Sequence, residues 1–437
     1  MAFSPFDSAI YRKLYGDDEI AKLFSDSAEV RAMLLVEGML AKAQGELGVI
    51  PQDSAFFIHR ASMELQVDPA GLADGVAASG VAVPALVDAF RKTMEAPDHA
   101  QYVHWGATSQ DIIDTALVLR LRQYIAIVDE RLSKLIEILT AKAIENRDVV
   151  MVARTGSQIA TPTTFGAKIA GWIAPLNRHQ ERLAELRKRL LVVSMAGASG
   201  NYAALGDKGF EIEAALAKAL KLEVPQSPWH SARDSFAELA SALSLITGSL
   251  GKIGQDIQLL TQTEVAEITV ADGGSSTMPH KSDPVLAELL ITLAKNNANL
   301  VGQMHGALLH SHEHDGAAWA LEWHALPQIC IGCSVALRQA TTLTAGIQVN
   351  CARTQSNIAA THGFIMADAA MFALAKNMPH PEARKLVETC CTEASQTYRH
   401  LRDVLEEKSP VSLDWDNVFD PANYTGLATQ IVDRLKC

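Results

Sequence analysis

The sequence lacks the features that mark disulfide-rich, membrane-spanning or nucleic-acid-binding proteins. Its 6 cysteines in 437 residues form no disulfide framework. No apolar run is long enough to cross a bilayer, and residues 1–15 do not have the layout of a signal peptide. The net charge of −12 argues against binding to nucleic acid. We therefore expect a cytoplasmic protein that binds neither membrane nor nucleic acid.

Two of the cysteines, Cys330 and Cys333, have the spacing of a redox or metal-binding pair. They lie within a helical pattern, and no second pair of cysteines accompanies them. We expect buried, reduced thiols there, with a redox or metal role as the alternative.

Aromatic residues are scarce, at 6%, while alanine is abundant, a composition that suits closely packed helices. Hydrophobic residues recur at steps of three and four along much of the chain, as in amphipathic helices. The most regular pattern runs from Phe236 to Leu260 and is a heptad seam, typical of helices that cross at a shallow angle. No alternating strand pattern and no internal repeat is evident, so the predicted fold class is all-α.

The helix of residues 236–260 carries a second face of small residues, including Ala240, Gly248 and Gly251. Small residues let neighbouring helices come close, which predicts a helix that is buried on all sides. We interpret it as the core of a large bundle that several subunits share. The alternative is an ordinary core helix of a monomer.

Changes in helix length and in glycine and proline content divide the chain into three predicted domains. Residues 1–98 read as a small domain of short helices, and residues 351–437 as another in which prolines interrupt short helices. Residues 99–350 contain the long helical patterns and are predicted to form a central bundle. Those patterns lie near residues 121–139, 163–191, 236–260, 284–309 and 326–347.

A polar stretch interrupts the central region at residues 273–284, which read Gly-Gly-Ser-Ser-Thr-Met-Pro-His-Lys-Ser-Asp-Pro. Its two glycines let backbone N–H groups approach a ligand closely, and its prolines exclude regular helix or strand. Asp283-Pro284 reads as an N-cap followed by proline at the first helical position. The hydroxyl, imidazole, ammonium and carboxylate groups make the stretch a candidate site, although composition alone fits a flexible linker equally well.

Two other loops share this design of a polar stretch before a predicted helix, at residues 104–111 and 154–158. In the first, Thr108 and Asp111 have capping-box spacing, with Asp in place of the usual Glu or Gln. Free backbone N–H groups and the helix dipole favour anions at such positions by about 0.3–1 kcal/mol per helix end. The loops therefore suit an anionic ligand.

The three loops together contain His104, Arg154, Ser275 and Lys281. Groups of this kind beside helix N-termini suit a small substrate with two or three carboxylates. Capping explains the Ser, Thr and Asp residues of the loops but does not explain the imidazole, the guanidinium and the ammonium. For these three side chains the alternative is simple exposure to solvent.

A different constellation, His310-Ser311-His312-Glu313-His314-Asp315, alternates histidines with acids in the way that metal ligands often do. Such a motif usually follows a strand, whose period of two places the histidines on one face. The flanking residues here read as helix or loop. We therefore predict no metal, and a metal site at these residues is the alternative.

Residues Gly274 to Pro284 closely resemble the signature of the fumarase/aspartase superfamily, usually written GSSxMPxKxNP. Residues 104–111 resemble the first region of that family, and residues 154–166 resemble the second. The resemblance covers nearly the whole chain. Within the superfamily it is strongest toward the cycloisomerases of 3-carboxy-cis,cis-muconate, followed by the adenylosuccinate lyases. The stretches that favour the cycloisomerases are Tyr102–Asp111, Pro228–His230, Arg233–Asp234, Gly273–Lys281, Trp319 and Glu322–Trp323.

The resemblance implies a three-domain subunit whose long central helices form one bundle in a homotetramer, with each active site assembled from three subunits. It implies a small di- or tricarboxylate substrate and no metal or organic cofactor. In the chemistry of the family, a base removes a proton next to a carboxylate, an aci-carboxylate forms, and the group on the neighbouring carbon leaves. For a cycloisomerase of aromatic catabolism, this chemistry interconverts a carboxymuconate and its lactone.

Catalytic roles carry over from the matching positions. The resemblance implies that Ser275 is the base, on a loop that closes over substrate, that Lys281 stabilises the developing negative charge, and that His104 sits at the substrate. A serine hydroxyl is too weak an acid to ionise at neutral pH unless N–H donors and a nearby cation assist it in a dry site. The predicted substrate-binding residues are Thr108, Ser109, Gln158, Arg154, Ser276, Met278, Asp283 and His314.

The chain departs from the family at Gly156, where the second region usually carries a histidine. In the amine-releasing lyases that histidine protonates the leaving group. An amine leaves poorly without a proton, whereas a carboxylate leaves readily as an anion. The glycine therefore favours a reaction in which a carboxylate leaves or attacks, as in lactonisation of a muconate.

Two further departures concern carboxylate binding. Asp283 replaces the asparagine of the signature, and His314 stands where an arginine is expected, so that anion binding there requires a protonated imidazole. The alternatives to a cycloisomerase are a lyase that releases fumarate from an N-substituted aspartate, and an inactive helical scaffold.

Overall fold

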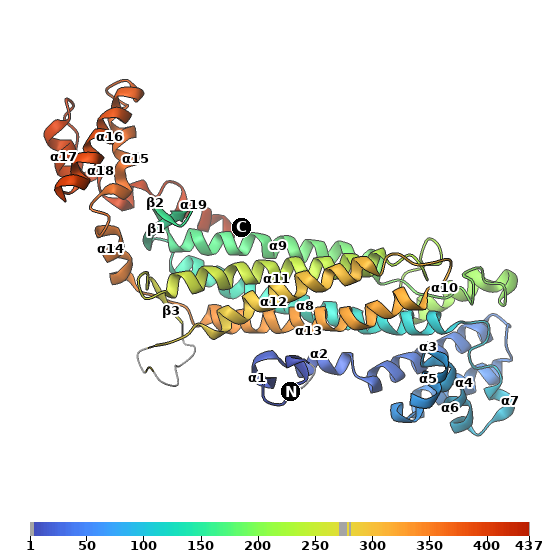
Figure 1. Ribbon diagram of the computed structural model, residues 1–437. Coiled ribbons are helices and arrows are strands. Elements are labelled where there is room, and N and C mark those ends of the chain that lie inside the picture. The colour runs from blue at the N-terminus through green and yellow to red at the C-terminus, as the bar shows by residue number, and fades with distance from the viewer. Residues whose placement is uncertain (1–3, 271–277, 279–280, 437) are drawn as a thin grey trace. The chain divides into compact units, whose positions relative to one another are not determined.

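The computed structural model describes residues 4–270, 278 and 281–436, and its described part is dominated by helices (Figure 1). Most helices before residue 101 are short, and α3 is the exception with 21 residues: α1 (Arg12–Tyr15), α2 (Asp18–Leu23), α3 (Asp26–Glu46), α4 (Gln52–Glu64), α5 (Ala73–Ser79), α6 (Val83–Met94) and α7 (Pro97–Ala100). The next group contains five long helices, α8 (Ser109–Glu145), α9 (Phe165–Leu190), α11 (Asp234–Thr261), α12 (Val285–Gly306) and α13 (Gly316–Ala345), and the shorter α10 (Gly209–Leu220).

The remaining α-helices are again short: α14 (Cys351–Ala359), α15 (Ala367–Leu374), α16 (His380–Thr397), α17 (Leu401–Lys408), α18 (Trp415–Val418) and α19 (Ala428–Asp433). Single 3₁₀ turns lie at Pro5–Asp7, Pro69–Leu72, Gly206–Lys208, Phe364–Met366, Pro421–Tyr424 and Arg434–Lys436. The long helices predicted for the central region are therefore present, and the described helices outside it are all shorter than these five, although α3 is longer than expected for that region. The long helix predicted near residues 326–347 begins ten residues earlier than expected, because it continues through Pro327.

The chain divides into two compact units. The first consists of residues 1–132, 179–248 and 292–338, and the second of residues 133–178, 249–291 and 339–437. Each of the five longest helices passes from one unit into the other. The boundaries of the three predicted domains stay a prediction.

The hydrophobic seam of α11 is buried as predicted. Every seam residue from Phe236 to Leu260 is at most 4% exposed. Small residues allow close packing on another side, since a Cβ atom at Gly254 would lie 2.6 Å from the carbonyl oxygen of Ala287 on α12. The single chain nevertheless leaves Leu245 and Leu259 exposed by 51% and 46%. The prediction of a helix buried on all sides is thus wrong for one chain alone.

Residues 150–164 form a β-hairpin that the sequence did not predict. Strand β1 (Val150–Thr155) pairs antiparallel with β2 (Gln158–Thr164). The two residues of the turn, Gly156 and Ser157, have left-handed φ angles of 55° and 64°, as a tight type I′ turn requires. Helix α9 therefore begins at Phe165, slightly later than expected. A second, smaller antiparallel pair joins β3 (Ile268–Thr269) to β4 (Gln348–Val349).

Cys330 and Cys333 are fully buried in α13, as expected. The Tyr124 hydroxyl donates a hydrogen bond to the Cys330 carbonyl oxygen over 2.9 Å. Burial raises the pKa of Cys333 to about 12, which keeps its thiol protonated. This environment is that of a packed core residue.

None of the described helices is by itself long and apolar enough to cross a membrane. One bent pair, Cys351–Ala359 with Phe364–Leu374, meets the same criterion by length and composition alone, with an angle of 81° between its helices.

Candidate active site

The start of α8 is held by the capping residues that its sequence predicted. The backbone N–H of Thr108 donates to Asp111 Oδ2 over 2.9 Å, which is the reciprocal bond of a capping box. Asp111 is fully buried and also accepts hydrogen bonds from the backbone N–H groups of Ala196 and Gly197, each at 2.9 Å. One carboxylate thus fixes the end of the helix against the 196–197 loop.

A chain of hydrogen bonds extends from Asp111 to His314. His230 Nε2 lies 2.7 Å from Asp111 Oδ1, and the His230 carbonyl oxygen accepts from Gln110 Nε2 at 2.8 Å. The other atom of that amide, Gln110 Oε1, lies 2.5 Å from His314 Nδ1. Because an amide oxygen only accepts, His314 must donate through Nδ1, and Nε2 is the nitrogen left for an anion. The structure therefore places His314 beside Gln110 in the first turn of α8.

A buried ion cluster lies behind His314. Arg233 is 2% exposed and forms paired hydrogen bonds of 2.6 and 3.0 Å to Asp114 and of 2.7 and 2.6 Å to Glu322. Burial disfavours the charged guanidinium, but the two carboxylates outweigh it and raise the pKa of Arg233. The indole N–H of Trp319 donates to Asp114 at 3.3 Å, while the ring meets His314 edge-on at 5.6 Å. This cluster makes a rigid wall for the site.

His104 is paired with an acid that the sequence reasoning missed. Its Nδ1 lies 2.7 Å from Oε1 of Glu37, a residue of α3 whose side chain is 1% exposed. The second carboxylate oxygen, Oε2, is buried and has no hydrogen-bond partner among the residues that the structure describes. Burial lowers the pKa of His104, but the hydrogen bond and the charge of Glu37 outweigh it, so that the net pKa is raised. The one signal for this pair in the sequence was the position of Glu37, an acid on the buried face of a helix.

The backbone at His104 has a left-handed φ of 63°. Non-glycine residues in this region are uncommon and tend to occur at functional sites. The amide nitrogen of the Gln44 side chain donates to the Trp105 carbonyl oxygen over 2.7 Å and anchors the same loop to α3. The loop before α8 is therefore held firmly on both of its sides.

Arg154 lies in the hairpin and not at a helix N-terminus. Its guanidinium donates two parallel hydrogen bonds to Glu267, of 2.9 and 2.8 Å. The Glu267 side chain is fully buried and also accepts from Asn357 Nδ2 at 3.0 Å. Arg154 thus ties the hairpin to a buried acid, whereas Gln158 is exposed beside the turn.

Lys281 forms an ion pair with Asp283, the residue that replaces the asparagine of the family signature. The Lys281 Nζ to Asp283 Oδ1 distance is 2.8 Å, and the side chains are 49% and 37% exposed. Helix α12 begins at Val285, directly after Asp283-Pro284, and the N-cap role of Asp283 stays a prediction. Met278 is exposed. The predicted base, Ser275, and its neighbour Ser276 lie outside the described residues.

The predicted site residues thus form two groups. The first group belongs to the first unit and consists of His104, Thr108, Ser109 and His314. The first three lie in or just before the start of α8, and His314 contacts that start through Gln110. Arg154, Gln158, Met278, Lys281 and Asp283 belong to the second unit. In the first group, His104, Thr108 and His314 form hydrogen bonds to the buried side chains of Glu37, Asp111 and Gln110. The charges of the second group, Arg154 and Lys281, are paired with acids of their own unit.

The histidine-rich stretch 310–315 caps a helix. Asp315 accepts from the backbone N–H groups of Ser311, Ala317 and Ala318 at 2.9 to 3.1 Å, at the start of α13. These hydrogen bonds, that from Ser311 first, lower the pKa of Asp315 to about 2. Within the described ranges no group of three His, Cys, Asp or Glu side chains is arranged to hold a metal ion.

Comparisons with known proteins match nearly the whole chain. A family model described as lyase matches residues 14–297, and a model described as adenylosuccinate lyase C-terminus matches residues 363–435. The 3-carboxy-cis,cis-muconate cycloisomerase of Pseudomonas aeruginosa is 41% identical over 423 residues, which cover 94% of this chain and 92% of that protein.

Solved structures give the same result. The 3-carboxy-cis,cis-muconate lactonizing enzyme from Pseudomonas putida matches with a TM-score of 0.92 and 40% identity, over 98% of each chain. The fumarate lyase from Mesorhizobium sp. BNC1 matches with a TM-score of 0.91 and 36% identity, over 96% of this chain and 98% of that one. This chain therefore belongs to the lyase family, the fumarase/aspartase superfamily that its sequence resembles.

Proposed function

We propose that the protein is a cycloisomerase that interconverts 3-carboxy-cis,cis-muconate and its lactone. The observation that carries this proposal is the match to enzymes of that activity, at 40% and 41% identity over 98% and 94% of the chain. A small tricarboxylate also suits the residue types concerned, which are two histidines and a helix N-terminus in the first unit and a lysine in the second.

Lactonisation takes up one proton and the opposite reaction releases it, and no other atom is gained or lost. In lactonisation a carboxylate oxygen of the substrate forms a C–O bond to an alkene carbon. The electron pair moves to the neighbouring carbon, where an adjacent carboxylate stabilises it as an aci-carboxylate, and this carbon then takes up a proton. In the opposite direction a base removes that proton and the carboxylate leaves as an anion.

Ser275 is the proposed group that transfers this proton, and Lys281 is the proposed counter-charge of the aci-carboxylate. Electrostatic stabilisation of this kind is commonly the largest contribution to catalysis. His104 is proposed as a cationic contact to a substrate carboxylate, since its pairing with Glu37 over 2.7 Å favours the imidazolium form. Thr108, Ser109 and His314 would bind a carboxylate at the start of α8.

The hairpin turn supports a carboxylate as the leaving or attacking group. A Cβ atom at Gly156 would meet no other atom within 4 Å, so packing does not exclude the histidine of the amine-releasing lyases. The left-handed φ of 55° favours glycine but is tolerated by polar residues. The absence of the histidine therefore fits a reaction that has no amine to protonate.

We propose that the active enzyme is a cytoplasmic homotetramer with three-domain subunits and shared active sites. Leu245 and Leu259 of α11 are about half exposed in a single chain, on the helix with the most regular seam. Large exposed leucines on a core-type helix suit burial against another subunit. A stable monomer in sedimentation analysis would contradict this part of the proposal.

The reaction is tested by adding 3-carboxy-cis,cis-muconate to the purified protein and following loss of the ultraviolet absorbance of its conjugated diene. We expect turnover that the Ser275→Ala variant reduces by at least about a hundredfold, the usual contribution of a general acid or base. Unchanged turnover in Ser275→Ala would refute the proposed base.

The second candidate, a fumarate-releasing lyase, is favoured by the match of residues 363–435 to the adenylosuccinate lyase C-terminus. A panel of N-substituted aspartates tests it, with fumarate as the measured product. Fumarate release together with no action on the muconate would replace the first candidate by the second. No turnover of either substrate class by the folded protein would favour an inactive scaffold.

A further inference from the structure

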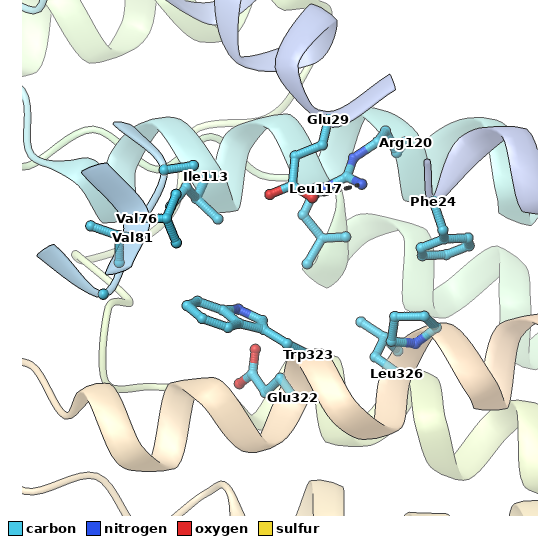
Figure 2. A pocket seen from close by; sticks show the side chains of 13 residues that line it. Phe24, Glu29, Val76, Val81, Ile113, Leu117, Arg120, Glu322, Trp323 and Leu326 are labelled. Atoms are coloured by element: carbon cyan, nitrogen blue, oxygen red, sulfur yellow. Dashed lines mark ion pairs between the residues drawn. The ribbon is translucent and has the colours of Figure 1, made fainter. Parts of the chain in front are cut away.

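A pocket of about 330 Å³ lies in the first unit, and none of the predicted catalytic or substrate-binding residues lines it, although Glu322 of the Arg233 ion cluster does. Its walls come from five parts of the chain: the end of α2, α3, α5 with the turn that follows it, α8 and α13 (Figure 2). Its size is at the lower end of the range for pockets that hold small organic molecules.

Most of the pocket wall is apolar. The aliphatic side chains of Val76, Val81, Ile113 and Leu117 contribute to it, as do several others farther along the pocket. Figure 2 shows the Trp323 ring and Glu322 of α13 on one side, and Leu117, Glu29 and Arg120 on the opposite side. Such walls match a flat, apolar ligand body.

One buried cation interrupts this apolar wall. The Arg120 side chain is only 8% exposed, and its nearest acid, Glu29, is 3.7 Å away, beyond hydrogen-bond distance. Its two hydrogen bonds in the described part of the chain are both 3.4 Å long and reach the carbonyl oxygens of Ala116 and Leu23. Burial lowers the pKa of Arg120, and Glu29 offsets this only in part.

The contrast with Arg233 shows how unusual this arrangement is. Arg233 is buried to a similar extent, but its guanidinium makes hydrogen bonds of 2.6 to 3.0 Å to two carboxylates. A buried guanidinium is normally compensated in this way, because an unpaired charge is costly to remove from water. Arg120 therefore has the capacity for an additional anionic partner from within the pocket.

We propose that this pocket binds a small aromatic monocarboxylate, with the carboxylate on Arg120 and the ring between Trp323 and the aliphatic wall. A guanidinium binds a carboxylate through two parallel hydrogen bonds, which no other residue of the pocket provides. A second negative charge is disfavoured, because Glu29 and Glu322 are the other charged groups at the pocket wall. The site thus differs in charge preference from an active site for tricarboxylates.

Glu29 competes with the ligand carboxylate for the guanidinium of Arg120. Its side chain is 37% exposed and stands beside Arg120 without a direct hydrogen bond, so that a ligand can displace it toward solvent. Removal of its charge should therefore strengthen binding, while removal of the Arg120 charge should weaken it. Nonspecific association of the ligand with the protein would not give both of these opposite effects.

The test measures binding of benzoate to the purified full-length protein by isothermal titration calorimetry. We expect one site per chain, with benzamide, the neutral analogue, binding at least tenfold more weakly. Arg120→Gln should weaken benzoate binding at least tenfold, and Glu29→Gln should strengthen it about threefold. Arg122→Gln is the matched control, since Arg122 lies on the same helix, bonds the Leu220 carbonyl oxygen and does not line the pocket.

Val81→Trp is a second variant, which should leave the buried Arg233 ion cluster intact. Val81 lies in the turn between α5 and α6 and is only half-buried. The substitution should fill the pocket and abolish benzoate binding while turnover of the main substrate is unchanged. Equal binding of benzoate to the native protein, Arg120→Gln and Val81→Trp would overturn the proposal. So would loss of binding in Lys281→Ala, which would assign benzoate to the active site. Dissociation of the oligomer by Val81→Trp would instead identify a second copy of the chain as the occupant.

Discussion

The loop before α8 and the hairpin of residues 150–164 belong to different units, yet both contain a basic side chain that is held by a buried acid. His104 is 2.7 Å from Glu37, and Arg154 makes two hydrogen bonds to Glu267. The acids are 1% and 0% exposed, so neither can turn away to solvent. Both basic side chains are therefore held in position by their acids.

The segment that contains Lys281 differs from both. Its acid, Asp283, is 37% exposed and lies only two residues away in the chain. An exposed carboxylate of this kind can be displaced, because water solvates it after it leaves. The pairs thus differ in freedom of movement: Glu37 and Glu267 are held in the interior beside their partners, whereas Asp283 can leave Lys281 for solvent. We therefore expect a substrate carboxylate to compete with Asp283 and not with the two buried acids.

The largest effect is expected at Arg233, because this buried guanidinium is paired with two buried carboxylates. Arg233→Met leaves Asp114 and Glu322 buried without their common partner, which should destabilise the first unit by about 3–5 kcal/mol. Thermal unfolding followed by circular dichroism should show a clearly lowered Tm. Arg189→Met is the matched control, because the Arg189–Glu238 pair is exposed, and it should leave Tm nearly unchanged. A Tm of Arg233→Met equal to that of the control would contradict the role of the cluster.

Glu37→Gln should have the next largest effect, because it removes the charge that positions His104. We expect kcat/KM to fall about tenfold, the value of one charge-assisted hydrogen bond. Glu37 raises the pKa of His104, so the cation and the stability of the pair are present at low pH and are lost as pH rises through that raised pKa.

The pH profile separates positioning from simple damage to the fold. In Glu37→Gln the alkaline limb of kcat/KM should move to lower pH, because the imidazolium has lost its partner. Glu37→Asp should recover part of the native profile. An unshifted limb with a uniformly lower rate would contradict a role through His104.

Asp283→Asn should have a smaller effect in the opposite direction. It restores the asparagine of the family signature and frees Lys281 from its exposed partner, so KM for a tricarboxylate should fall about two- to fivefold, as expected for an exposed ion pair. The effect should shrink at high salt. It should also vanish in a Lys281→Gln background, and a full effect in that double variant would show that Asp283 acts independently of Lys281.

The helical fold was predictable because it rests on local periodicity, and the α8 cap was predictable because its two residues are close in sequence. Thr108 and Asp111 are three residues apart, and their predicted bond is present. Partners that are distant in sequence could not be found in this way. Glu37 lies 67 residues before His104, and Glu267 lies 113 residues after Arg154.

The hairpin was missed for a different reason. Its strands are only 6 and 7 residues long, and Pro162 lies within the second. A proline in an apparent strand argues against that assignment unless the strand lies at a sheet edge, which is the case in a two-stranded sheet. The Gly156-Ser157 turn was visible in the sequence but was interpreted as a helix start.

The smallest effect is expected at Gly156. Gly156→His restores the family's histidine in a turn where a Cβ atom meets nothing within 4 Å. The left-handed φ of 55° should cost about 1 kcal/mol of stability. Turnover of carboxymuconate should stay within about twofold of the native value, because a carboxylate that leaves or attacks needs no proton from this position. Gly156→Ala, with the same backbone cost and no imidazole, is the control. A change of tenfold or more in Gly156→His, absent from Gly156→Ala, would mean that proton transfer at the hairpin limits the reaction.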